Sequence, residues 1–374
     1  MPGEVQRGLE DVVALESRIC FIDGREGRLL YRGYDIRDLA AHATFEEVAY
    51  LLWHGRLPTA AELGELKRQL EALRSVPDEL VRELYELPMG ANPMDVLRTA
   101  VSALAIYEPE QAGPGPSSIG GAQHLTAALP TILGAYHRRR MQLPDLVPRP
   151  GLSHAAYLVY ALLNREPTEL EARAVEVALI LHADHDLNAS TFAARVTAST
   201  LSDLYSAVTS AVGALKGPLH GGANERVVEL LEEIGTPEQV EGAVRAKLAR
   251  HERIMGFGHR VYKVEDPRAT ILRGWSRRLG EAKGNLRYYR LLEKMVEVVH
   301  REKGLYPNLD LYSGSVYTLL GVPIDLFTPV FAASRVVGWT AHVLEEYDDL
   351  RLIRPVSRYV GPTDLVYAPV GERS

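Results

Sequence analysis

The chain has 374 residues, of which 46% are hydrophobic and 24% charged, an ordinary balance for a globular protein of one large or two modest domains. Its single cysteine, Cys20, excludes an intrachain disulfide and a multi-cysteine zinc site, and it is typical of the reducing cytoplasm. A formal net charge of -7 argues against a nucleic-acid partner. We expect neither export nor a membrane span, because the N-terminus lacks a signal-peptide pattern and no apolar run approaches ~20 residues.

The N-terminal region predicts a small β element. Residues 18–22 and 28–31 carry strand-type side chains, and the segment 23–27 between them reads Asp-Gly-Arg-Glu-Gly, which is a turn signal. Farther along the chain, strands do not alternate with helices, so a parallel sheet is not expected. The fold class predicted from these patterns is mainly α.

Helix start signals recur along the rest of the chain. Residues 44–47 and 59–62 both read Thr-x-x-Glu and predict capping boxes, each followed by apolar residues at helical spacing. Another helix is predicted to begin at Ser202, and one at residues 236–239, where an N-cap threonine precedes a proline. Connecting loops are predicted at residues 111–118 and 144–150.

His220 is the first residue whose surroundings suggest chemistry. It lies between Gly217-Pro218 and Gly221-Gly222, which predict a tight turn leading into a helix N-terminus. The positive end of a helix dipole disfavours an imidazolium, and a neutral imidazole can donate an N–H to a developing enolate. The alternative is a histidine packed in a glycine-rich loop.

Two further segments complete a set suited to removing a proton from a carbon acid. His259 follows Gly256-Phe257-Gly258, whose glycines allow close approach to a ligand but do not form a dinucleotide fingerprint. As a hydrogen-bond donor His259 would polarise a ketone; alone, it would be read as a surface-loop histidine. Asp310 alone would be read as a cap or a solvated carboxylate. Beside the two histidines it is a candidate base, whose pKa desolvation would raise.

Residues 182–186 read His-Ala-Asp-His-Asp, a pattern that could bind a divalent ion. On a helix, His182 and Asp186 would share a face while His185 would point elsewhere. No other His/Cys cluster accompanies this segment. We therefore predict no metal site, with a His/Asp metal hydrolase as the alternative.

Several cationic side chains suit an anionic ligand. Guanidinium groups bind carboxylates bidentately, although each arginine alone is most often a surface ion-pair partner. The arginines that suit a dicarboxylate are Arg268, Arg335 and Arg354. A short basic stretch would hold the phosphates of a nucleotide-like ligand, or be a solvated loop, and comprises Arg253, Arg260, Lys263 and Arg268.

Taken together, these segments resemble the citrate synthase family. The resemblance covers nearly the whole chain, from residues 8–10 and 31–34 through 188–195 to the Arg354-Pro355 tail, and the length is similar to the shorter, dimeric branch. It implies a two-domain helical fold with a small N-terminal β element. The large, dimer-forming domain would comprise residues 1–221 plus 325–374, and the small mobile domain residues 222–324.

The resemblance also implies a role for each residue singled out above. Asp310 matches the base that takes a proton from the acetyl-CoA methyl group, His220 the residue that stabilises the enol, and His259 the donor to the oxaloacetate carbonyl. The implied oxaloacetate contacts are His185, Arg268, Arg335 and Arg354, the last supplied by the partner subunit of a homodimer. The implied CoA-binding residues are Lys263 and Arg253. Citryl-CoA would be hydrolysed to citrate and CoA without a metal or prosthetic group.

Departures from the family pattern leave the acyl substrate open. Leu311 follows the candidate base where many relatives carry an aromatic residue, and residues 154–160 lack an expected Asn-Phe. Because neighbours of this kind shape an acyl pocket, 2-methylcitrate synthase, which uses propionyl-CoA, stays an alternative. So does a non-catalytic paralogue that binds metabolites. The segment 310–314 favours the acetyl enzyme.

Overall fold

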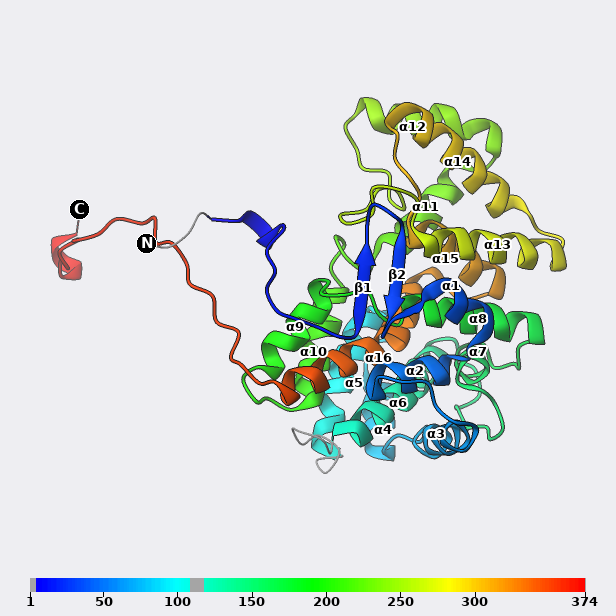
Figure 1. Cartoon of the computed structure of the whole chain (residues 1–374), viewed down its shortest axis with the longest axis horizontal. Coiled ribbons are helices and arrows are strands. Elements are labelled where there is room, and N and C mark those ends of the chain that lie inside the picture. The colour runs from blue at the N-terminus through cyan, green and yellow to red at the C-terminus, as the bar shows by residue number, and fades with distance from the viewer. Residues whose placement is uncertain (1–4, 108–117, 374) are drawn as a thin grey trace.

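The computed structural model describes residues 5–107 and 118–373, and helices dominate it (Figure 1). This confirms the prediction of a mainly α protein with a small N-terminal β element. The loop predicted at residues 111–118 falls almost entirely outside the described residues, whereas residues 144–150 form the expected connection.

The β element is an antiparallel sheet in the order β1-β2-β3. The predicted hairpin consists of β1 (Cys20–Asp23) and β2 (Arg28–Tyr31), with Cys20 paired to Tyr31. Leu29 and Tyr31 are buried while Arg28 is exposed, as the alternation of side chains along a strand requires. A short third strand, β3 (Tyr34–Asp35), was not predicted.

The helices form one series along the chain. In order, they are α1 (Ile36–His42), α2 (Phe45–His54), α3 (Ala60–Ala72), α4 (Asp78–Glu86), α5 (Pro93–Tyr107), α6 (Ser118–Arg140), α7 (His154–Leu163), α8 (Glu169–His182), α9 (Ala189–Ala198), α10 (Leu204–Leu215), α11 (Ala223–Ile234), α12 (Val240–Ala249), α13 (Pro267–Ala282), α14 (Arg287–Lys303), α15 (Leu309–Leu320) and α16 (Phe327–Asp348). Short 3₁₀ turns are η1 (Arg7–Leu9), η3 (Pro237–Gln239), η4 (Ile324–Leu326) and η5 (Val370–Glu372).

Helix caps account for many of these boundaries. The predicted boxes at residues 44–47 and 59–62 both form, and each such cap contributes about 1 kcal/mol. Two predicted starts were wrong in detail. Asp203 rather than Ser202 caps α10, since its side chain accepts from the Ser206 N–H. Residues 236–239 make no side-chain cap and form η3 before α12 begins.

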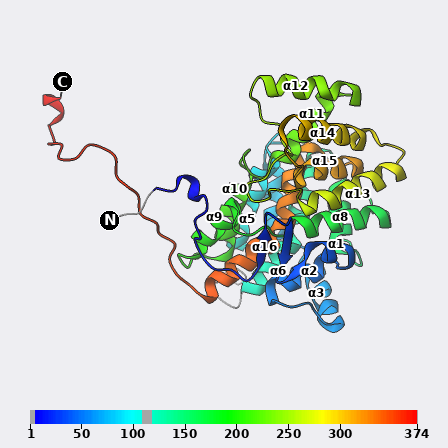
Figure 2. The same ribbon diagram turned by 45° about the horizontal axis from the view of Figure 1, so that its top comes forward.

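Helix α16 runs through the centre of the molecule and organises the packing around it. It contacts α2, α6, α8, α9 and α10, and most of its residues are buried. Helices α11, α12 and α14 gather at one end of the molecule, while α3, α4 and α6 lie toward the other (Figures 1 and 2). The segments before β1 and after α16 extend away from the helices.

No single helix among the described residues is long and apolar enough to cross a bilayer. The helices Leu309–Leu320 and Ile324–Asp348 meet the length and composition criteria only as a pair, across a bend of 119°.

Candidate functional site

The loops that carry His259 and Asp310 are hydrogen-bonded to each other. The backbone N–H of Asn308 donates to the carbonyl of Gly256 at 2.9 Å, and the Asn308 side chain donates to the carbonyl of Gly258 at 2.9 Å. Asn308 also caps α15, because its side-chain oxygen accepts from the Asp310 N–H at 3.1 Å. Two segments about fifty residues apart are thereby fixed side by side.

His259 is held as a neutral imidazole with a defined tautomer. Its Nδ1 accepts from the backbone N–H groups of Val261, at 3.0 Å, and Tyr262, at 3.2 Å. The proton of the neutral ring therefore sits on Nε2, which is a donor. Burial lowers the pKa of His259 to about 4, and the positive charge of Arg268 acts in the same direction. At neutral pH this side chain can donate a hydrogen bond without carrying a charge.

His220 lies on the turn before α11, as the flanking glycines predicted. Its Nε2 accepts from the backbone N–H of Ser190 at 3.3 Å and lies 2.8 Å from the Ser190 hydroxyl oxygen. With Nε2 as acceptor, Nδ1 carries the proton and is free to donate. Burial lowers the pKa of His220 to about 4, with a further contribution from the positive charge of Arg335. The indole N–H of Trp339 donates to the same Ser190 hydroxyl at 3.0 Å.

Asp310 is in the first turn of α15 and has the properties of a general base. Burial raises the pKa of its carboxyl group from 3.8 to about 6, while the positive charge of Arg268 acts against this rise. A base of this pKa is ionised at neutral pH and still holds a proton well enough to accept one from a weak acid.

The candidate carboxylate-binding residues are buried and held in place. Arg268 donates to both oxygens of Asp266, at 3.0 and 2.8 Å, a partner that sequence reasoning missed. The Arg335 Nε donates to the His182 carbonyl at 2.5 Å, and its guanidinium stacks 4.7 Å from the centre of the Phe331 ring. These intrachain contacts hold both guanidinium groups in place.

His185 lies beside these arginines. Its ring centre is 5.1 Å from that of His259, and burial together with the Arg268 charge holds its pKa well below the ordinary value. Its Nε2 is buried and makes no hydrogen bond within the described part of the chain. A buried polar atom of this kind suits a ligand oxygen.

The charges of Arg268 and Arg335 act on several of the sequence-predicted residues, as neighbours in one cluster would. Arg268 changes the pKa of Asp310, His259 and His185. Arg335 changes the pKa of Asp310 and His220, and it also acts on His185. The structure therefore brings together Asp310, His220, His259, His185, Arg268 and Arg335.

The remaining predicted residues lie apart from this cluster or at its edge. Lys263 is in the loop after His259, and its backbone N–H donates to the Gly24 carbonyl of the β1–β2 turn at 2.7 Å. Arg253 is exposed in the connection after α12, and Arg354 is exposed in the segment after α16.

The expected helical geometry of residues 182–186 was wrong. Helix α8 ends at His182, and Asp186 has a left-handed backbone with φ 51°. The His182 Nδ1 lies 2.7 Å from the carbonyl of Ala178, whereas Asp184 faces His342 on α16. Among residues 5–107 and 118–373, no group of three or more His, Cys, Asp or Glu side chains is arranged to hold a metal ion.

Comparisons with known proteins identify relatives of this chain. The family model described as citrate synthase, C-terminal domain, matches residues 8–356. The chain is 50% identical to citrate synthase of Haloferax volcanii over the full length of both. It is 48% identical to citrate synthase 2 of Bacillus subtilis, over 98% of this chain and 99% of the relative. A 2-methylcitrate synthase of Mycobacterium tuberculosis is less similar, at 42% identity over 96% of this chain and 91% of the relative.

A solved structure shares the fold. The ternary complex of Thermoplasma acidophilum citrate synthase with carboxymethyl coenzyme A and oxaloacetate superposes with a TM-score of 0.93 and 38% identity, covering 99% of this chain and all of that one. The comparisons confirm the predicted family and an enzyme with citrate synthase activity. The chain belongs to the citrate synthase family.

Proposed function

We propose that Asp310, His220 and His259 carry out the citrate synthase reaction of this enzyme, in which acetyl-CoA, oxaloacetate and water give citrate and CoA. The observation that carries the assignment is the shared site. A carboxyl group with a pKa of about 6 lies on a loop hydrogen-bonded to the His259 loop, and Arg335 couples it to His220. A base and two neutral donors are the groups that enolisation and carbonyl addition require.

Enolisation of acetyl-CoA uses Asp310 and His220. The Asp310 carboxylate takes a proton from the methyl group of acetyl-CoA, and the C–H electron pair moves toward the thioester carbonyl. The Nδ1–H of His220 donates to the oxygen that gains charge, and Ser190 holds the ring in the required orientation. Positioned acid–base groups contribute about 10²–10⁴-fold each in rate.

Carbon–carbon bond formation uses the second histidine and the arginines. The Nε2–H of His259 donates to the keto oxygen of oxaloacetate, so the carbonyl carbon becomes more electrophilic. Arg268 and Arg335 bind the substrate carboxylates, and the unpaired Nε2 of His185 faces the same ligand. Water then cleaves the thioester of citryl-CoA to release CoA.

Domain closure would complete this site. We assign residues 1–221 plus 325–374 to the large domain and 222–324 to the small mobile domain. Closing one onto the other excludes water from the enolate and strengthens each donor. Lys263 lies on the His259 loop where that loop meets the β1–β2 turn, and we assign it with Arg253 to the CoA phosphates. We expect no resident metal or prosthetic group, so prolonged dialysis against a chelator should leave turnover unchanged.

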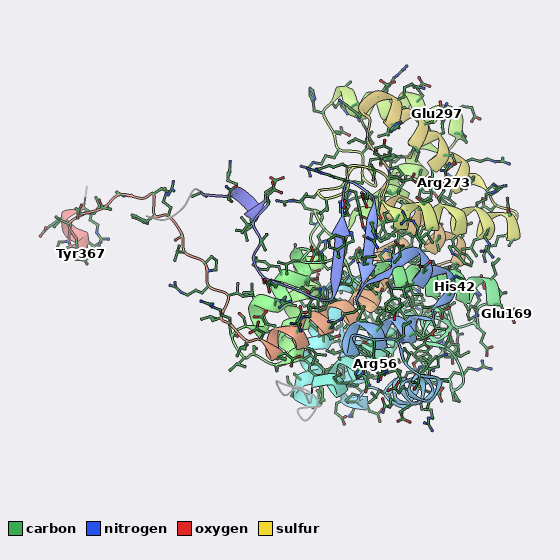
Figure 3. All side chains as sticks on the ribbon, viewed as in Figure 1. His42, Arg56, Glu169, Arg273, Glu297 and Tyr367 are labelled. Atoms are coloured by element: carbon green, nitrogen blue, oxygen red, sulfur yellow. The ribbon has the colours of Figure 1, made fainter. Side chains whose placement is uncertain are left out.

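A homodimer would supply Arg354 across the interface. Arg354 lies in the exposed segment after α16, and this segment extends away from the helices (Figure 1). This segment exposes large apolar side chains, including Val360, Val366 and Tyr367, the last labelled at its far end in Figure 3. Exposed apolar stretches of this kind are typical of surfaces that a partner covers. We also propose a cytoplasmic location, as the single cysteine suggested.

Acetyl-CoA is the proposed acyl substrate. The unusual Leu311 is fully buried, and a Cβ at Gly256 would come within 2.7 Å of it, so Leu311 packs against the His259 loop. Its size therefore gives no reason to expect a larger acyl group. Side-by-side values of kcat/KM for acetyl-CoA and propionyl-CoA decide the matter, because one methylene is worth about 1–3 kcal/mol. A preference for propionyl-CoA would favour 2-methylcitrate synthase.

The test of the proposed function is release of free CoA by Asp310→Asn. We expect turnover to fall by about 10²–10⁴-fold while oxaloacetate still binds, because only the base is removed. Asp38→Asn, a first-turn residue of α1, is the matched control and should keep wild-type turnover. Wild-type turnover by Asp310→Asn would refute the role of this carboxylate. Wild-type protein that released no CoA would favour a non-catalytic paralogue.

A further inference from the structure

A line of buried ionisable side chains lies behind the loop that carries His185. Asp184, in that loop, and His342, on α16, are both 0% exposed. The His342 Nε2 lies 3.3 and 3.4 Å from the two carboxylate oxygens of Asp184. On the other side of the ring, Nδ1 lies 3.3 Å from a guanidinium nitrogen of Arg195 on α9. The reaction as described above uses none of these three groups.

The contacts of His342 define where its proton sits. A guanidinium has donors and no acceptor, so Arg195 donates to Nδ1 of His342. The neutral ring then carries its proton on Nε2, directed at the Asp184 carboxylate. A proton on Nδ1 would instead face the Arg195 N–H group. His342 therefore accepts a hydrogen bond from the buried cation Arg195 on one side and donates one to the buried anion Asp184 on the other.

Arg195 is itself held firmly. Its Nε donates to Glu346 at 2.8 Å, and a second guanidinium nitrogen donates to Glu345 at 2.7 Å. Both carboxylates lie on α16, on the same helix as His342. The guanidinium cannot turn away from His342 without breaking a buried ion pair with Glu346 and a partly buried one with Glu345, which is strongly unfavourable.

Asp184 connects this line to the substrate-binding residues. Its carboxylate accepts from the Asp186 N–H at 3.2 Å, and its backbone carbonyl accepts from the Tyr31 hydroxyl at 2.8 Å. The negative charge of Asp184 also opposes the effect of burial on the pKa of Arg335. Asp184 is thus held through both its side chain and its backbone carbonyl. It precedes His185 in the chain, and its negative charge favours the charged form of Arg335.

We propose that Asp184 and His342 form a positioning pair for oxaloacetate, which clamps the His185 loop onto α16 and keeps Arg335 in its binding orientation. The inference rests on the proposed roles of His185 and Arg335. The expected effect of the clamp is on oxaloacetate, because the pair holds the His185 loop and its charge acts on Arg335, and both His185 and Arg335 are assigned to that substrate. Its signature is a change in oxaloacetate binding with acetyl-CoA binding preserved.

Two amide substitutions at His342 separate positioning from packing. The amide nitrogen of glutamine reaches as far from the backbone as Nε2, so His342→Gln retains a donor to Asp184. The amide of asparagine reaches only as far as Nδ1, so His342→Asn loses that donor. We expect KM for oxaloacetate to stay within about threefold for His342→Gln and to rise about tenfold or more for His342→Asn, because the lost bond has a charged acceptor. KM for acetyl-CoA should change less than about twofold in both.

His154→Gln and His154→Asn are the matched controls. His154 is an equally buried histidine on α7, and neither ring nitrogen has a hydrogen-bond partner within the described part of the chain. These variants should lower thermal stability without a selective change in KM for oxaloacetate. Equal effects of glutamine and asparagine at position 342, or parallel rises in both KM values, would overturn the proposal.

Binding of oxaloacetate can be measured by calorimetry without turnover. This test of the positioning pair is therefore valid even if the proposed catalytic roles are wrong. We expect His342→Asn and Asp184→Asn to bind oxaloacetate about tenfold more weakly than wild type. Wild-type affinity in both variants would refute the clamp. If both variants fail to fold while His342→Gln folds, the pair is a requirement for folding and the positioning role is refuted.

Discussion

The hydroxyl oxygen of Ser190 lies 2.8 Å from Nε2 of His220, and the backbone N–H of the same serine donates to that nitrogen from 3.3 Å. The serine is in the first turn of α9, thirty residues earlier in the chain, and Trp339 on α16 holds its hydroxyl from the other side. The orientation of His220 is therefore set by two helices that do not carry it.

Ser190→Ala tests this arrangement. The hydroxyl contact with His220 is lost while the backbone contact remains, and a neutral hydrogen bond contributes about 1 kcal/mol. We expect kcat to fall about fivefold, measured as CoA release at saturating substrates. The free energy of unfolding should also fall by about 1–3 kcal/mol, because the buried Trp339 N–H loses its acceptor. Ser210→Ala, on α10, is the control, and unchanged kcat in Ser190→Ala would contradict the orienting role.

The rate should depend on pH through Asp310. The base works as a carboxylate, and burial raises its pKa to about 6, so kcat/KM for acetyl-CoA should rise with pH and level off above about 6. His220 and His259, whose pKa values are lowered to about 4, stay neutral over this range. A profile with its midpoint at the ordinary value of 3.8 would show that Asp310 is not buried during the reaction.

Because its pKa is raised in the folded state, the ionised Asp310 carboxylate lowers the stability of the fold at neutral pH. A group that binds its proton more tightly in the folded state than in the unfolded state loses stability as pH rises, here between 3.8 and about 6. Asparagine mimics the protonated form, so Asp310→Asn should have a higher Tm than wild type at neutral pH. The difference should shrink as pH falls below that window. A lower Tm for the variant at neutral pH would contradict the assigned shift.

Gly338 on α16 packs closely against Ala183 and Asp184, next to His185. A Cβ there would lie 2.2 Å from the Ala183 carbonyl oxygen and 2.5 Å from an Asp184 carboxylate oxygen. Gly338→Ala must push the His185 loop off α16, so we expect a loss of about 1–3 kcal/mol in unfolding free energy and a raised KM for oxaloacetate.

Gly274→Ala provides the comparison for that variant. Gly274 is exposed within α13, and a Cβ there would meet no atom within 4 Å. It should gain up to about 1 kcal/mol from the higher helix propensity of alanine. Equal stability of the two variants in urea denaturation would refute the close packing at Gly338.

The origin of Arg354 can be tested with two inactive variants. Arg354→Ala lacks the arginine and Asp310→Asn lacks the base, so each homodimer should be inactive. If Arg354 acts across the interface, a mixed dimer has one intact site, and equal co-expression should restore about one quarter of the wild-type sites. If Arg354 served its own chain, every site in the mixture would lack a group and no activity would return.

Local signals in the sequence predicted much of the fold. The boxes at residues 44–47 and 59–62 and the turn at 23–27 depend on neighbouring residues, so short patterns reveal them. Ser202 does not cap α10, because Asp203 beside it is an equally good capping residue and accepts the hydrogen bond from the Ser206 N–H.

Contacts between residues far apart in the chain explain which parts of the site could not be predicted from the sequence. The motifs identified His220, His259 and Asp310, whereas Ser190 carried only the local signature of a helix start capped by Asn188. Nothing in its neighbours indicates a histidine thirty positions away. Residues 182–186 were misread for the same reason, since their conformation is set by contacts with α16, far along the chain, rather than by helix periodicity.

Helix α16 has a consequence for the enzyme as it leaves the ribosome. Among the described residues it is the last α-helix, and it carries Arg335, Trp339 and His342. A nascent chain that has emerged only as far as α15 already contains Asp310, His220 and His259, yet it lacks Trp339, which holds the Ser190 hydroxyl beside His220. We therefore expect synthesis to pass residue 342 before the proposed acid–base groups can be held in their working orientation.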